Sequence, residues 1–354
     1  MTDYQKELEE LIVTVTKEGA SDLHLTVGGH PTIRVSGDLI PLVKKPRLSA
    51  EDVVGLITQV LTAENKEQFW QTKELDFSYQ AAEGVRFRGN AFFQRGVVGA
   101  AFRLIPNKIR TLAELNLPER LIDFARHEQG FFLVVGPVGQ GKSTTLASMI
   151  QAINLERAEH IITIEDPVEY LFANDKSIID QREVRFDTRG FTEAMKSMFR
   201  EDVNVVMLGE MRNPETIATA VTAAETGHLV FSTLHTNSAS QTIDRIIDSF
   251  PGNQQNQIRV QLAGSLIGIF SQRLLPRVSG GLIPAYELLI NNSAVSNLIR
   301  EARTAEIDVV IETGSESGMI NLNNSLADLV RQSEIAVETA TRHSLDPRGL
   351  ERML

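Results

Sequence analysis

A glycine-rich stretch, residues 136–144, has the spacing of a loop that binds phosphate. It reads Gly136, Pro137, Val138, Gly139, Gln140, Gly141, Lys142, Ser143 and Thr144. These residues match G-x-x-x-x-G-K-[ST] at every fixed position, and the glycines let several backbone N–H groups point at one anion. Lys142 supplies a mobile positive charge for the β- and γ-phosphates, and the Ser143 hydroxyl is a ligand for Mg²⁺. This phosphate loop predicts nucleotide binding but does not reveal the use of the nucleotide.

Three carboxylates follow another apolar run, residues 161–164. They are Glu165, Asp166 and Glu169. Carboxylates beside a phosphate loop can bind Mg²⁺, directly or through water, and can orient an attacking water. The alternative is a solvated acidic turn, which is the usual fate of clustered charges. Their place directly after a strand favours the site.

Two further polar residues follow apolar runs. Glu210 comes after residues 205–208, although Gly209 occupies the place where such a strand usually ends in aspartate. The alternative is that Glu210 caps the helix beginning near Asn213. His235 follows residues 229–233 and could donate a hydrogen bond to a γ-phosphate. For His228, at the entry of that strand, a structural role is an equal alternative.

Four arginines lie on the last strands predicted before residue 105: Arg86, Arg88, Arg95 and Arg103. Phosphoryl transfer often uses an arginine to stabilise charge that develops on the γ-phosphate. They are candidates for that role if this part of the chain faces the nucleotide of a neighbouring subunit. The alternative is a set of surface arginines on an exposed sheet face.

Periodicity divides the elements that must position these residues into two regions. The first is α+β with a mostly antiparallel sheet, and residues 106–110 are a plausible linker. Its predicted helices are 4–18 and 50–70, and its predicted strands are 21–27, 31–35, 39–43, 76–80, 85–94 and 97–104. The second region alternates strands and helices as a parallel sheet requires, and ligands bind such sheets at the carboxyl ends of the strands. Its predicted strands are 131–135, 161–165, 205–208 and 229–233; from about residue 238 the chain is expected to be largely helical, with a strand at 286–290.

Composition narrows the classes of protein. The 354 residues suffice for about two domains, with 42% hydrophobic and 23% charged residues. A net charge of −11 argues against a general nucleic-acid-binding surface. The absence of cysteine excludes disulfides and cysteine-based zinc sites. We find no signal-peptide pattern and no apolar run of about 18 residues that would span a membrane.

Four motifs together resemble those of the type II/IV secretion ATPases, and within them the retraction ATPases of type IV pili. The phosphate loop, IITIEDPVEY, VVMLGEMRNPETI and AAETGHLVFSTLHTNSA correspond to the Walker A, Asp box, Walker B and His box. The resemblance runs in colinear order from about residue 18 to 335. This chain departs from the usual pattern at Val138 and Gln140, where Thr and Ser are common. It also has Ser296 where an arginine is usual in the segment needed for retraction.

The resemblance implies an α/β fold with a PAS-like α+β N-terminal domain, residues 1–106, and a RecA-like ATPase domain with a helical C-terminal segment, residues 107–354. It further implies that Glu169 is the catalytic glutamate and that Glu210 acts on Mg²⁺ through water. His235 would contact the γ-phosphate of ATP. Arg88 and Arg103 match the N-terminal arginines that reach the nucleotide.

The implied protein is a hexameric motor ATPase that hydrolyses ATP to drive pilus retraction and twitching motility. It would be cytoplasmic, at the inner face of the cytoplasmic membrane at the pilus base. Its expected partners are further copies of the chain, an inner-membrane pilus platform protein and a second pilus ATPase, with no nucleic acid. The alternatives are an accessory retraction ATPase, an ATPase of pilus assembly or type II secretion, and a structural ring subunit that binds nucleotide but hydrolyses little.

Overall fold

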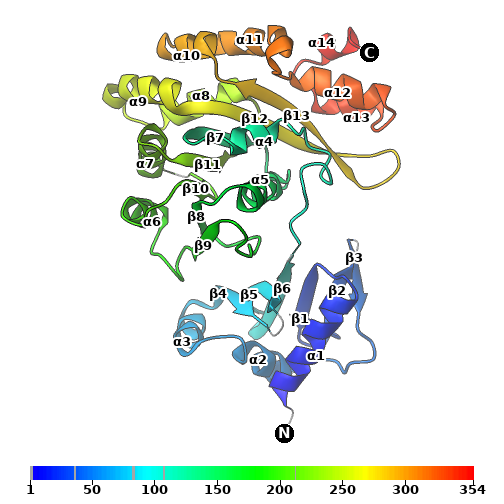
Figure 1. Cartoon of the computed structure of the whole chain (residues 1–354). Helices are drawn as coiled ribbons and strands as arrows, with labels where there is room; N and C mark the ends of the chain where they lie inside the picture. Colours follow the sequence, from blue (N-terminus) through cyan, green and yellow to red (C-terminus); the bar gives the residue numbers. More distant parts are fainter. Residues whose placement is uncertain (1–2, 36, 82–83, 107, 212) are drawn as a thin grey trace. The chain divides into compact units, whose positions relative to one another are not determined.

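The chain forms two compact units in the computed structural model, Met1–Asn107 and Lys108–Leu354 (Figure 1). The structure describes residues 3–35, 37–81, 84–106, 108–211 and 213–354. Within these ranges, no helix has the length and apolar character needed to cross a membrane.

The first unit is a six-stranded antiparallel sheet with the order β3-β2-β1-β6-β5-β4. Its strands are β1 (Asp22–Thr26), β2 (Thr32–Val35), β3 (Asp38–Pro41), β4 (Glu74–Gln80), β5 (Arg86–Gln94) and β6 (Val97–Ile105). Phe87 and Phe102 lie on the face that packs with helix α1 (Tyr4–Lys17) in one hydrophobic core. Because side chains alternate along a strand, Arg88 and Arg103 lie on the opposite face.

The prediction of one continuous helix over residues 50–70 is wrong. The structure has two helices, α2 (Ala50–Thr58) and α3 (Ala63–Thr72). The Thr62 side chain accepts a hydrogen bond from the Asn65 N–H, which caps the start of α3. Ser49 and Asp52 form a reciprocal capping box at the start of α2. Two capped starts in 14 residues divide a segment whose apolar periodicity looks continuous.

The second unit is built on a seven-stranded sheet with the order β13-β12-β7-β11-β10-β8-β9. All neighbours are parallel except β12 and β13. Its strands are β7 (Gly130–Val135), β8 (His160–Glu165), β9 (Ile178–Glu183), β10 (Val205–Leu208), β11 (Leu229–Leu234), β12 (Leu266–Pro276) and β13 (Leu282–Ile290). The predicted strands at 131–135, 161–165, 205–208 and 229–233 are therefore confirmed.

Two strands of this sheet differ from the prediction of the sequence. Strand β9 was not predicted, and the region of β12 was expected to be helical. Helix α9 (Gly252–Ser265) ends inside the mainly apolar run 262–270, which Gly264, Ser265 and Gly268 interrupt. From Leu266 the chain pairs with β7 and β13 instead. Pairing with distant strands overrides the local pattern, which could not reveal the change.

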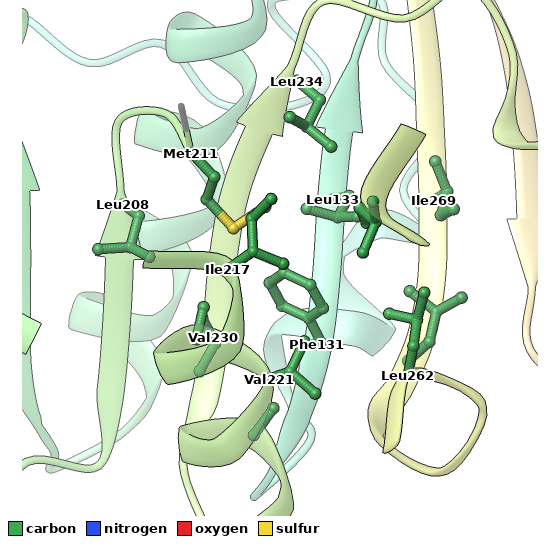
Figure 2. Close-up of a cluster of buried hydrophobic side chains, with 14 of the residues drawn as sticks. Phe131, Leu133, Leu208, Met211, Ile217, Val221, Val230, Leu234, Leu262 and Ile269 are labelled. Carbon is green, nitrogen blue, oxygen red and sulfur yellow. The ribbon is translucent and has the colours of Figure 1, made fainter. Parts of the chain in front are cut away.

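Helices cover both faces of this sheet (Figure 1). They are α4 (Leu121–Ala125), α5 (Lys142–Glu156), α6 (Phe191–Met198), α7 (Pro214–Glu225), α8 (Ala239–Asp248), α9, α10 (Ser293–Arg300), α11 (Ile307–Thr313), α12 (Leu322–Arg331), α13 (Val337–His343) and α14 (Pro347–Glu351). Phe131 and Leu133 on β7 join the core with α7 and α9 (Figure 2). Phe132 and Val134 join the core with α4 and α5. Burial on both faces makes β7 the rigid support of the phosphate loop.

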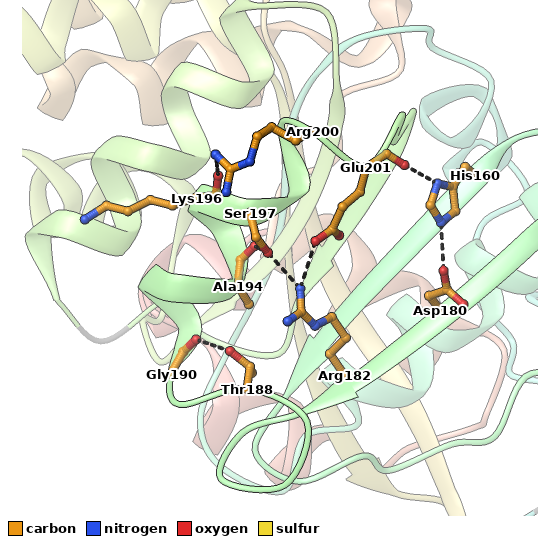
Figure 3. Close-up of polar contacts among 10 residues, drawn as sticks. All are labelled: His160, Asp180, Arg182, Thr188, Gly190, Ala194, Lys196, Ser197, Arg200 and Glu201. Carbon is orange, nitrogen blue, oxygen red and sulfur yellow. Dashed lines mark hydrogen bonds and ion pairs between the residues drawn. The ribbon is translucent and has the colours of Figure 1, made fainter.

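Polar contacts fix β9 and the segment after α6 (Figure 3). Arg182 on β9 donates to the Ser197 hydroxyl at 2.8 Å and pairs with Glu201 at 3.3 Å. His160 on β8 contacts Asp180 through Nε2 at 3.0 Å and the Glu201 carbonyl through Nδ1 at 2.8 Å. Burial lowers the pKa of His160, but these hydrogen bonds raise it by more, so the net shift is upward.

Candidate active site

The phosphate loop connects β7 to α5, as the sequence predicts. Gly136, Gly139 and Gly141 have φ values of 141°, 77° and 78°, a region that side-chain-bearing residues rarely adopt. A Cβ atom at Gly136 would also collide with the backbone carbonyl of Gln272. Gly136 therefore has two separate reasons to be glycine, the curl of the loop and its close approach to β12.

Lys142 lies inside this loop with only 7% of its surface exposed. Its Nζ donates to the carbonyls of Gly136 at 2.9 Å and Pro137 at 2.8 Å. Burial lowers the pKa of Lys142, and the charges of Glu169 and Glu210 oppose that shift without cancelling it. Its charge is thus placed among acceptors at the first turn of α5, where N–H groups and the helix dipole also favour an anion.

The carboxylates after β8 have different environments. Glu165 is buried, and its carboxylate accepts from the Thr163 hydroxyl at 2.7 Å and from the Glu169 backbone N–H at 3.2 Å. Burial raises the pKa of Glu165 to about 7. Asp166 pairs with Arg185 at 3.5 Å. Glu169 is exposed and lines the cavity. The buried carboxylate of Glu165 therefore holds the backbone of Glu169, whose own side chain lies at the cavity.

Glu210 and His235 come together beside Lys142. The His235 Nδ1 lies 3.2 Å from the Lys142 Nζ, and its Nε2 lies 3.8 Å from a Glu210 carboxylate oxygen. The proposed alternative for Glu210 as a helix cap does not hold, because the Asn213 side chain caps α7 by accepting from the Thr216 N–H.

One cavity of about 350 Å³ joins these groups. Its lining includes the predicted residues Val138, Gly139, Gln140, Gly141, Lys142, Ser143, Thr144, Glu169, Glu210 and His235. Tyr170 and Thr233 also line it, although we did not predict them as site residues. The Tyr170 hydroxyl lies 2.7 Å from the Thr144 hydroxyl. Its position next to Glu169 in the chain is the only sequence signal that could have found it.

His228 lies at the amino end of β11, the end opposite His235. Its Nδ1 contacts the Ala223 carbonyl at 3.0 Å, and its ring packs nearly perpendicular to the ring of Phe199 with the centroids 5.4 Å apart. These contacts support the structural alternative for His228.

The predicted arginines belong to the first unit. Arg88 on β5 is directly opposite Arg103 on β6. The Arg103 side chain is 70% exposed, and its Nε donates to Asp22 at 3.0 Å. Arg95, which we expected on a strand, lies in the turn between β5 and β6 with a φ of 50°. The reach of Arg88 and Arg103 to a nucleotide stays a prediction.

The cavity suits Mg²⁺ bound together with phosphates better than a cage made by protein alone. Among the residues that the structure places, no group of three His, Asp or Glu side chains could hold a metal ion. Mg²⁺ commonly takes one or two protein ligands, several waters and the phosphates of its nucleotide. The hydroxyl of Ser143 and the carboxylates of Glu169 and Glu210 line the same cavity and fit this pattern.

Known proteins share the sequence and fold of this chain. Residues 3–282 match the family model described as type II/IV secretion system protein. The chain belongs to this family. It is 43% identical over 343 residues to the type IV pilus retraction ATPase PilT of Pseudomonas aeruginosa, covering 97% of this chain and 99% of that protein. It is 45% identical over 321 residues to a twitching motility protein of Neisseria gonorrhoeae, covering 90% and 86%.

A solved structure extends this similarity from sequence to fold. The crystal structure of the pilus retraction motor PilT with bound ADP superposes with a TM-score of 0.92 at 46% identity, covering 97% of this chain and 98% of that chain. This chain thus has the fold class that the sequence predicts: a PAS-like α+β N-terminal domain followed by a RecA-like ATPase domain.

Proposed function

We propose that this chain is a motor ATPase that hydrolyses ATP to drive type IV pilus retraction and twitching motility. The observation that carries the proposal is the convergence of Lys142, Glu169, Glu210 and His235 on one cavity next to the phosphate loop. The similarity along the whole length of PilT supports the pilus as the site of action.

Residues 136–144 form the proposed ATP site. Backbone N–H groups of the loop and the first turn of α5 bind the phosphates, and Lys142 neutralises their charge. Ser143 and Glu210 are the proposed residues for Mg²⁺, which when bound neutralises the charge that develops during phosphoryl transfer. Thr144 lies at the side of the cavity marked by Tyr170.

Hydrolysis requires that a water be oriented and that negative charge be stabilised. Glu169 is the proposed group that orients the water, because its carboxylate is exposed at the cavity while Glu165 holds its backbone. His235 contacts the γ-phosphate from the end of β11. Arg88 and Arg103 supply further positive charge from the N-terminal domain.

The proposed assembly is a homohexamer in which domains 1–106 and 107–354 move relative to each other with each ATP. It would act in the cytoplasm, at the inner face of the membrane at the pilus base. An inner-membrane platform protein would receive the motion, and a second pilus ATPase would share the base. The net charge of −11 disfavours a nucleic-acid track.

Deletion of the gene in its host tests the direction of action. Excess pili that do not retract are expected, and a Lys142→Ala gene should fail to restore retraction. A gene carrying Glu312→Gln, an exposed carboxylate on α11, is the control and should restore it. Loss of pili on deletion would contradict retraction and indicate assembly.

A further inference from the structure

Strand β12 continues past the end of its neighbour β7. The last pair between them is Val135 with Ser271, yet β12 runs to Pro276. After Val135 the chain becomes the phosphate loop. The edge of β12 beyond Ser271 therefore faces this loop instead of a strand, and its backbone groups need partners from the loop.

Two glutamines provide these partners reciprocally. The Gln140 side-chain oxygen accepts from the backbone N–H of Leu274 at 2.7 Å. In return, the Gln272 side-chain amide donates to the backbone carbonyl of Gln140. The Gln272 oxygen accepts from the Thr145 hydroxyl in the first turn of α5 at 2.6 Å. Gln272 is 2% exposed, so the loop and the start of α5 share one buried anchor.

The next side chains along β12 hold the other loop of the site. Successive residues of a strand point to opposite faces, so Ser271 and Arg273 point away from Gln272. The Ser271 hydroxyl and the Arg273 guanidinium each donate to the Asn237 carbonyl at 3.1 Å. Asn237 lies two residues after His235. One strand therefore contacts both the loop that carries Lys142 and the loop that carries His235.

We propose that Gln140 and Gln272 are positioning residues. They fix the phosphate loop against β12 and so hold the side chain of Lys142 in its position beside His235 during turnover. This inference rests on the proposed ATPase function. A serine hydroxyl at position 140 would lie two bonds nearer the backbone than the Gln140 side-chain oxygen, so serine could not replace the contact with Leu274. We call the reciprocal contacts of Gln140 and Gln272 the latch. The motif G-x-x-x-x-G-K-[ST] fixes no residue type at position 140, so the motif alone does not encode the latch.

The test uses the full chain with Gln140→Met, which keeps the length of the side chain but removes the acceptor, and Gln140→Ser. Gln254→Met, on the exposed surface of α9, is the matched control. One neutral hydrogen bond lost from the bound loop should speed the release of a fluorescent ADP analogue about three- to tenfold. Hydrogen exchange at the Leu274 amide should also quicken in both Gln140 variants and remain unchanged in the control.

A double-mutant cycle with Gln272→Leu tests whether the two glutamines act together. Because the two glutamines form one latch, the double variant should speed ADP release by less than the combined effects of Gln140→Met and Gln272→Leu measured separately. Parent-like ADP release and Leu274 exchange in both Gln140 variants would overturn the latch. A parent that binds ADP but releases no phosphate from ATP would instead contradict the ATPase function, and ADP release would still decide the latch.

Discussion

The Nδ1 of His235 lies 3.2 Å from the Nζ of Lys142. An ammonium can only donate, so Nδ1 accepts in this contact and the imidazole proton lies on Nε2, toward Glu210. His235 thus lies between Lys142, the predicted phosphate-binding cation, and Glu210, the predicted metal-site acid. From this position we expect His235 to act in hydrolysis and not only in nucleotide binding.

His235→Ala is expected to lower kcat for phosphate release about 100-fold, because it removes an oriented polar group from the cavity. The KM for ATP should change only a few-fold. His235→Asn should recover part of the rate, since its side-chain oxygen can accept from Lys142. His228→Asn, at the other end of β11, is the control. Parent-like kcat in His235→Ala would show that this histidine has no part in hydrolysis.

Glu165 should make stability depend on pH. Its pKa is about 7 in the fold against an ordinary value of 4.5, so the folded state binds the proton more tightly. The free energy of unfolding contributed by this group is greatest below pH 4.5 and declines as pH rises to about 7. The full change is of order 3 kcal/mol. Chemical denaturation of the parent and Glu165→Gln across this range should show a difference that varies with pH, whereas Glu312→Gln should follow the parent at every pH.

Asp22 is expected to orient Arg103, which is otherwise largely exposed. If Arg103 acts on the nucleotide, Arg103→Ala should reduce kcat by about 1,000-fold, the scale of an arginine finger. Asp22→Asn should reduce it about tenfold or less, because the arginine remains but is less well held. Arg34→Ala is the matched control, since Arg34 lies 3.9 Å from the same carboxylate. Equal losses in Arg34→Ala and Arg103→Ala would indicate a structural role for both arginines.

Leu133 tests the support beneath the phosphate loop. It is fully buried at the centre of β7, so Leu133→Ala should cost about 3 kcal/mol of unfolding free energy. Leu155→Ala, at the exposed end of α5, should cost less than about 1 kcal/mol. Urea denaturation measures both. Equal costs would show that β7 is not the rigid part of the core.

Local sequence patterns predicted the strands, loop and helix that carry the site residues better than they predicted the contacts between distant parts of the chain. The strand of 131–135, the glycine spacing and the helix after Lys142 are all encoded within 25 residues. The rule that ligands lie at strand ends then predicted that Glu169, Glu210 and His235 would meet. It worked because β8, β10, β11 and β7 are parallel neighbours.

Contacts between distant parts of the chain were not predictable. Gln272 reaches Thr145 across 127 positions, and β12 itself was expected to be helical. Asp22 and Arg103 are 81 positions apart. Nothing in the local sequence marks such partners. Which residues meet depends on which strands lie side by side, and that order is set by the pairing of the whole sheet.

Phosphate release from ATP by the full chain with Mg²⁺ tests the central claim most directly. The parent should hydrolyse ATP, and Glu169→Gln should bind a fluorescent ADP analogue with parent-like affinity while its kcat falls at least 100-fold. That combination separates the chemistry at Glu169 from binding at the phosphate loop. A parent that binds nucleotide without releasing phosphate, or a Glu169→Gln variant with parent-like kcat, would contradict the account.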